Sequence, residues 1–158
     1  MLFRSDQATV NRFKAIGAGL AVHPGSRYLG TAGGGPPFRM ILDSGIHVGV
    51  GSDAAQVTTL SPWAMISYMV TGRNAGGELV NNGQQITREE ALRLYTAENG
   101  WFFHEEDTLG SIEAGKLGDL VVLSDDYFDR TQVPDENIRQ LKSVLTVVDG
   151  KVVYDEMR

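Results

Sequence analysis

Two short, largely apolar runs near the start of the chain limit the folds that this sequence can adopt. Residues 19–23 and residues 46–51 each have the pattern of a buried β-strand. Residues 38–44 between them predict one or two helical turns that end at Gly45, and residues 6–16 carry apolar side chains at helical spacing. Because apolar strands separated by helices are typical of parallel sheets covered on both faces, the sequence predicts an α/β fold.

Capping signals predict the next elements. Ser61 followed by Pro62 indicates a helix start, and Thr87 with Glu90 forms a capping box that opens a second helix. We expect that second helix to end at Asn99 and Gly100. Residues 26–37 contain three consecutive glycines and two prolines, so we expect a loop there.

The last third of the chain is rich in predicted strands. Residues 119–124, 144–148 and 151–154 have strand patterns, and the Asp-Gly pair at 149–150 predicts a hairpin turn. A short helix is expected from Pro134. We therefore place a boundary near Leu109, with a partial α/β barrel segment at residues 1–108 and a small antiparallel β-sandwich segment at residues 109–158.

Charge and composition exclude several functional classes. The net charge of −6 argues against nucleic-acid partners and against adsorption to an anionic membrane. No apolar run approaches the ~20 residues of a membrane span, and the chain has no cysteine for disulfides or thiolate metal ligands. We expect a cytoplasmic protein.

Asp53 is the strongest candidate for a functional side chain. It follows the predicted strand at 46–51, and parallel α/β folds place catalytic groups just beyond the carboxyl ends of their strands. A carboxylate held rigidly at such a strand end suits a metal ligand or a general base. The simpler alternative is that Asp53 only caps a turn or a helix.

Histidines and one arginine are the other candidates. His23 ends the first predicted strand, so it lies at the same rim as Asp53, and the two side chains can share a site. Arg73, in a glycine-rich loop, is a candidate substrate contact. His47 and His104 are expected to be packed or surface residues. Three scattered histidines and one aspartate do not define a zinc site, which needs at least three protein ligands.

Two nucleotide-binding patterns are present in incomplete form. Residues 49–54 fit G-x-G-x-x-A after a strand, but Asp53 would face a pyrophosphate with the wrong charge. Moreover, no helix is predicted to start at Ala54. A dinucleotide-binding domain is therefore the weakest alternative. Residues 110–117 nearly match a P-loop, but Leu117 replaces the hydroxyl that would hold magnesium, which favours a simple turn.

Three segments, taken in order, resemble the C-terminal portion of the amidohydrolase superfamily of metal-dependent hydrolases, and the branch called amidohydrolase family 3 is the nearest. They are residues 46–54, 110–123 and 143–154. The resemblance extends from about Gly19 to Tyr154. It implies that the chain carries about strands seven and eight of a (β/α)8 barrel, followed by most of a small β-sandwich.

The resemblance also implies roles for individual residues. Asp53 matches the aspartate at the end of the eighth strand, which binds the metal or sits beside it and takes the proton from the attacking water. The position of His23 is usually a substrate-side or structural residue. The family uses a divalent metal, for which we expect zinc. Its other ligands have no counterpart in this sequence, so we expect the chain alone to retain no metal.

We therefore expect the C-terminal part of an enzyme that hydrolyses C–N bonds in non-peptide amides or cyclic amides, or related bonds, of a small-molecule substrate. The chain alone is expected to be inactive. The alternative is a non-catalytic folding or association module. Since two strands cannot close an eight-stranded barrel, the exposed sheet edges invite a partner. We expect that partner to be a second copy of the chain or the missing N-terminal part of the same protein.

Overall fold

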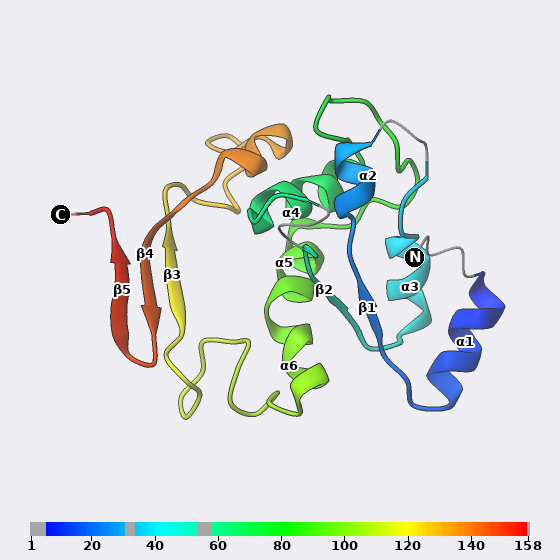
Figure 1. The fold of residues 1–158 in the computed structure, drawn as a ribbon, viewed down its shortest axis with the longest axis horizontal. Helices are drawn as coiled ribbons and strands as arrows, with labels where there is room; N and C mark the ends of the chain where they lie inside the picture. The colour runs from blue at the N-terminus through cyan, green and yellow to red at the C-terminus, as the bar shows by residue number, and fades with distance from the viewer. Residues whose placement is uncertain (1–5, 31–33, 54–57, 158) are drawn as a thin grey trace.

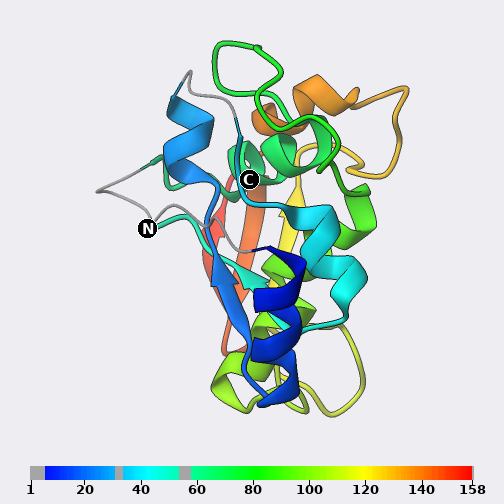
Figure 2. The ribbon, with the colours of Figure 1, turned by 90° about the vertical axis from the view of Figure 1, so that its right-hand side faces the viewer.

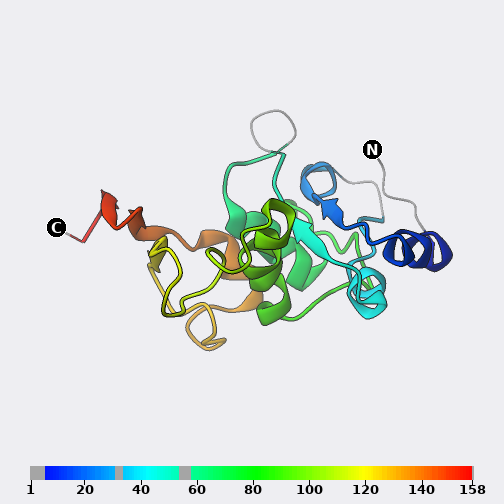
Figure 3. The ribbon, with the colours of Figure 1, turned by 90° about the horizontal axis from the view of Figure 1, so that it is seen from below.

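The computed structural model describes residues 6–30, 34–53 and 58–157. Figure 1 shows an α/β part built around two strands, and a separate antiparallel sheet at the opposite end of the long axis from α1. The view from below shows the same separation (Figure 3). The α/β class with a small antiparallel sheet agrees with the sequence-based prediction.

The two predicted apolar strands pair in parallel. β1 (Leu20–Val22) lies beside β2 (Val48–Val50), with Val22 opposite Val50. α1 (Gln7–Ala15) precedes β1, and the Asp6 carboxylate caps it by accepting a 2.8 Å hydrogen bond from the backbone N–H of Thr9. α1, β1 and β2 therefore follow one another in the predicted order.

Helices cover the sheet. α3 (Phe38–Ser44) connects the strands and ends at Gly45, whose left-handed conformation suits glycine. α1 and α3 pack against each other, while α5 (Arg88–Tyr95) and α6 (Ala97–Phe103) pack against β2 (Figures 1 and 2). All three β2 residues are buried, as expected for a covered strand.

α4 (Pro62–Thr71) is the centre of the core. Every residue from Trp63 to Met69 is buried, so this helix is enclosed on all sides. Its start at Ser61-Pro62 and the capping box of α5 both agree with the sequence-based prediction. In the capping box, the Glu90 carboxylate accepts a 2.8 Å hydrogen bond from the backbone N–H of Thr87.

The predicted end of the second helix is wrong. α5 ends at Tyr95, and Asn99 and Gly100 lie inside α6. The Asn99 side-chain amide donates to the carbonyl of Val50 (3.2 Å), so this side chain binds the end of β2 and does not cap a helix. α6 approaches β2 so closely that a Cβ on Gly49 would lie 2.1 Å from the Asn99 side-chain oxygen. Glycine at position 49 therefore permits this packing.

The prediction of a loop over residues 26–37 is wrong for its first part. A short helix, α2 (Gly25–Leu29), begins directly after Pro24. Pro24 has a helical backbone conformation, and proline's fixed φ suits a helix start. A Cβ on Gly25 would lie 2.8 Å from the Thr58 side chain, so glycine lets α2 pack against that segment. Residues 34–37 are irregular, as predicted.

The C-terminal strands form one antiparallel sheet. β3 (Leu120–Leu123), β4 (Ser143–Val148) and β5 (Lys151–Asp155) lie in that order. Asp149 and Gly150 connect β4 to β5 with φ values of 51° and 67°, which confirms the predicted hairpin turn. Residues 110–117 form turns and no helix, in agreement with their interpretation as a turn.

The connection between β3 and β4 packs on the α/β part. It contains η1 (Asp135–Gln140), a 3-10 helix at the position of the predicted short helix. Arg88 of α5 is 3% exposed and donates hydrogen bonds to the carbonyls of Tyr127 and Val133. The same side chain pairs with Asp135 at 2.7 Å. The proposed boundary near residue 109 stays a prediction.

The antiparallel sheet has apolar side chains on both faces, and they are exposed. Leu120, Val121 and Val122 of β3, and Val152 and Val153 of β5, are all classed as exposed. Consecutive strand residues point to opposite faces, so exposed apolar side chains occur on both faces, whereas most of β4 and Leu123 are half-buried.

Among residues 6–30, 34–53 and 58–157, no helix combines the length and the apolar character that a membrane span requires.

Candidate active site

The parallel pairing of β1 and β2 brings two candidate residues together. His23 directly follows β1, and Asp53 lies three residues beyond the end of β2. His23 Nε2 and Asp53 Oδ2 are 3.8 Å apart, with side-chain exposures of 31% and 54%. The predicted shared position at one rim of the sheet is therefore present, and both groups remain accessible to a ligand.

The backbone places Asp53 where the chain leaves the sheet. The N–H of Gly51 donates to the carbonyl of Val22 (3.1 Å), which extends the parallel pairing one residue beyond β2. Asp53 then adopts a φ of 51°, in the left-handed region. Non-glycine residues occupy this region infrequently, although aspartate tolerates it better than most. Asp149 has the same φ in the turn between β4 and β5, so this conformation at Asp53 fits a turn as well as a functional role.

The imidazole of His23 has two different environments. Its Nε2 faces Asp53, whereas its Nδ1 is buried and has no hydrogen-bond partner among the described residues. A buried polar atom without a partner is costly, and each such atom in a native structure calls for an explanation. Nδ1 thus marks a place where a further polar group would stabilise the site.

The described donors do not make a complete metal site. The imidazole of His23 and the carboxylate of Asp53 are both zinc-type ligands, but a zinc site needs at least three protein ligands. No group of three or more His, Cys, Asp or Glu side chains suited to a metal occurs in the described ranges. His47 stacks on Trp101 at 4.3 Å, and His104 ends α6 as an exposed residue. The described residues alone therefore do not fit a catalytic metal.

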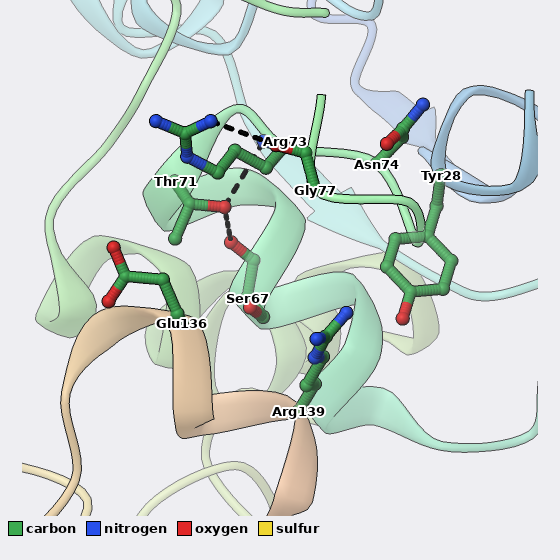
Figure 4. A pocket seen from close by; sticks show the side chains of 8 residues that line it. All are labelled: Tyr28, Ser67, Thr71, Arg73, Asn74, Gly77, Glu136 and Arg139. Atoms are coloured by element: carbon green, nitrogen blue, oxygen red, sulfur yellow. Dashed lines mark hydrogen bonds between the residues drawn. The ribbon is translucent and has the colours of Figure 1, made fainter. Parts of the chain in front are cut away.

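Arg73 lies apart from this pair, in a pocket beside α4. It follows α4, and its guanidinium Nη1 donates to the carbonyl of Gly77 (2.8 Å). Neither His23 nor Asp53 lines this pocket, so the structure unites two of the three candidates and separates the third. Its lining residues are Tyr28, Ser67, Thr71, Arg73, Asn74, Gly77, Glu136 and Arg139 (Figure 4).

Sequence reasoning did not identify Tyr28, Glu136 and Arg139 as members of this pocket. They come from α2 and η1, far along the chain from Arg73. No local pattern marks them, because only the packing of these elements around α4 brings them together.

His23 and Asp53 lie at the carboxyl ends of parallel strands, where α/β-barrel enzymes have their active sites. The model of the amidohydrolase family matches residues 1–154, and the chain belongs to this family. The resemblance inferred from three short segments is thereby confirmed.

One sequence relative agrees with this membership, and two solved structures share the fold. The N-substituted formamide deformylase of Arthrobacter pascens is 33% identical over 119 residues, which cover 75% of this chain and 21% of that protein. Zinc-bound atrazine chlorohydrolase TrzN from Arthrobacter aurescens TC1 superimposes with a TM-score of 0.72 at 20% identity, covering 100% of this chain and 36% of the other. Guanine deaminase from E. coli gives 0.71 at 20% identity, covering 96% and 37%. The chain thus spans between about a fifth and somewhat more than a third of the length of these proteins.

Proposed function

We propose that this chain forms the C-terminal part of a metal-dependent amidohydrolase that hydrolyses C–N bonds of non-peptide amides or cyclic amides, or related bonds, in a small molecule. The observation that carries the proposal is the His23–Asp53 pair at 3.8 Å, at the carboxyl ends of two parallel strands. Family membership supports the reaction class, as do relatives named for deformylation and deamination. The part of the barrel that we propose is strands seven and eight.

In this proposal Asp53 is the general base. Its carboxylate is 54% exposed, so it can accept a proton from the water that attacks the substrate. His23 lies close enough to orient Asp53 or to contact the substrate. We further propose that Asp53 is a ligand of the family's metal, for which zinc is expected, and that other parts of the complete enzyme supply the remaining ligands.

The isolated 158-residue chain should retain no stoichiometric zinc and should hydrolyse no amide substrate. Two ligands leave the other coordination positions of a metal ion to water, so the ion is held weakly and without fixed geometry. The test is elemental analysis after dialysis, together with an assay of a panel of formamides and cyclic amides with added zinc. One tightly bound zinc per chain, or robust zinc-stimulated hydrolysis, would contradict the incomplete site.

A non-catalytic folding or association module is the second candidate function. The exposed apolar side chains on both faces of the antiparallel sheet favour it. The dinucleotide-binding alternative gains no support from the family match. It requires a helix that starts at Ala54, and Ala54 lies outside the described residues. The absence of nucleic-acid and membrane partners, and the cytoplasmic location, stay predictions.

We also propose that the isolated chain associates with further copies of itself through the open edges of its parallel sheet. β1 and β2 form a two-stranded sheet whose outer edges have no further strand among the described residues. Burial of Val121, Val152 and Val153 would add to the driving force, since all three are exposed in the single chain. Light scattering should therefore show a dimer or a larger species. A clean monomer at tens of micromolar would count against this proposal.

A further inference from the structure

His23 and Asp53 lie beyond the hydrogen bonds that join β1 to β2. Among the described residues, the last backbone bond between the two segments runs from the N–H of Gly51 to the carbonyl of Val22 (3.1 Å). The backbone pairing therefore does not by itself fix the 3.8 Å separation of the His23 and Asp53 side chains. A further contact between the two segments occurs at Gly25, directly above the end of β1 (Figure 1).

Gly25, the first residue of α2, contacts the chain on both sides of Asp53. A Cβ at position 25 would lie 3.1 Å from the carbonyl oxygen of Ser52 and 2.8 Å from two carbons of the Thr58 side chain. Because non-bonded carbon atoms pack at about 3.5–4.0 Å, a methyl group there would force one of the two segments to move. The contact thus joins α2 to the residue just before Asp53 and to a residue five positions after it.

The helix α2 is anchored at both of its ends. Pro24 is fully buried, and its carbonyl accepts a hydrogen bond from the N–H of Tyr28 (3.0 Å). At the other end, the N–H of Ala75 donates to the carbonyl of Tyr28 (2.7 Å). The side-chain amide of buried Asn74 donates to the carbonyl of Gly30 (2.9 Å). These contacts resist a shift of α2.

The segment that follows β2 is less tightly packed than α2. Gly51 and Asp53 are exposed, and Ser52 is half-buried. A methyl group at position 25 would therefore displace the Ser52 backbone, and Asp53 with it, before it displaced α2. The backbone of Gly25 lies outside the left-handed region, and alanine forms helices more readily than glycine. The steric contact is thus the unfavourable consequence of an alanine at this position.

We propose that Gly25 is a positioning residue, because the absence of a side chain there sets the placement of Asp53 beside His23. This role of Gly25 rests on the proposed function of Asp53 as the general base. Catalytic groups must be held within about 0.5 Å of their productive position, so a small displacement of Asp53 should lower kcat.

The first test measures geometry and does not depend on catalysis. In the isotopically labelled 158-residue chain, Gly25→Ala should shift the backbone amide signals of Ser52 and Asp53. Thr58→Gly removes the two carbons at 2.8 Å, so the same substitution should cause smaller shifts in the Thr58→Gly background. Gly118→Ala adds a methyl group where no described atom lies within 4 Å, and both signals should stay in place. Unshifted signals in Gly25→Ala would overturn the proposal.

The second test measures steady-state kinetics in the complete enzyme. Gly25→Ala should lower kcat about tenfold to a hundredfold and change KM by less than about twofold, because a misplacement near 1 Å can cost that much. The loss should be smaller in the Thr58→Gly background, whereas Gly118→Ala should keep the kcat of the unaltered enzyme. An equal loss in both backgrounds would overturn the steric contact as its cause.

Asp53→Asn separates this proposal from the proposed function. If Asp53→Asn abolished turnover while Gly25→Ala kept full turnover, only the positioning role of Gly25 would be overturned. Full turnover in Asp53→Asn would overturn the role of Asp53 as the general base, and the positioning role with it.

Discussion

Replacing Asp53 with asparagine in the complete enzyme should lower kcat by about 10²–10⁴-fold, the usual contribution of a positioned general base. Asparagine preserves the size of the side chain and tolerates the left-handed backbone, where Asp53 has a φ of 51°. It removes the negative charge that would accept a proton from water. The measurement is steady-state hydrolysis, with metal content determined on the same samples to separate loss of the base from loss of the metal.

Asp43→Asn is the matched control for this substitution. Asp43 lies on α3 with a 62% exposed side chain and pairs with Arg39, so its replacement makes the same change in charge at the surface. Its kcat should remain that of the unaltered enzyme. Undiminished metal-dependent turnover in Asp53→Asn would remove the basis for the catalytic assignment.

Replacing Arg88 with methionine should lower the free energy of unfolding by about 2–6 kcal/mol, because two carbonyls of buried residues lose their donor at about 1–3 kcal/mol each. Arg88 is 3% exposed and joins α5 to the connection between β3 and β4. Without it, the carbonyls of Tyr127 and Val133 lose their donor, and Asp135 loses a partner at 2.7 Å. Urea denaturation followed by circular dichroism measures the difference.

Arg93→Met provides the comparison on the same helix. Arg93 is 58% exposed and pairs with Glu98 at 3.2 Å, so its loss should change stability by less than about 1 kcal/mol. If Arg88→Met lowered the free energy of unfolding no more than Arg93→Met does, the contacts of Arg88 would not be what holds the connection to the α/β part.

Local chemistry was sufficient to predict most elements. The Ser61-Pro62 start of α4, the Thr87–Glu90 capping box and the Asp149–Gly150 turn all act over a few residues, and the structure contains each of them. The two wrong predictions, the loop over the first part of residues 26–37 and the helix end at Asn99 and Gly100, have one cause. α2 and the continuation of α6 through Asn99 depend on contacts with distant residues, such as Thr58 against Gly25 and Val50 against Asn99.

The candidate functional residues also include contacts that the sequence predicts and contacts that only the packing decides. The meeting of His23 and Asp53 follows from the sequence, because the carboxyl ends of two adjacent parallel strands emerge at one rim. The sequence by itself therefore determined the order of the strands, most of the helices, the family and this rim. Only the tertiary structure decided that Arg88 is buried against Asp135, 47 residues away, and that Arg73 shares a pocket with Arg139 instead of Asp53. Periodicity and capping are properties of neighbouring residues, whereas these pairings depend on how whole helices pack.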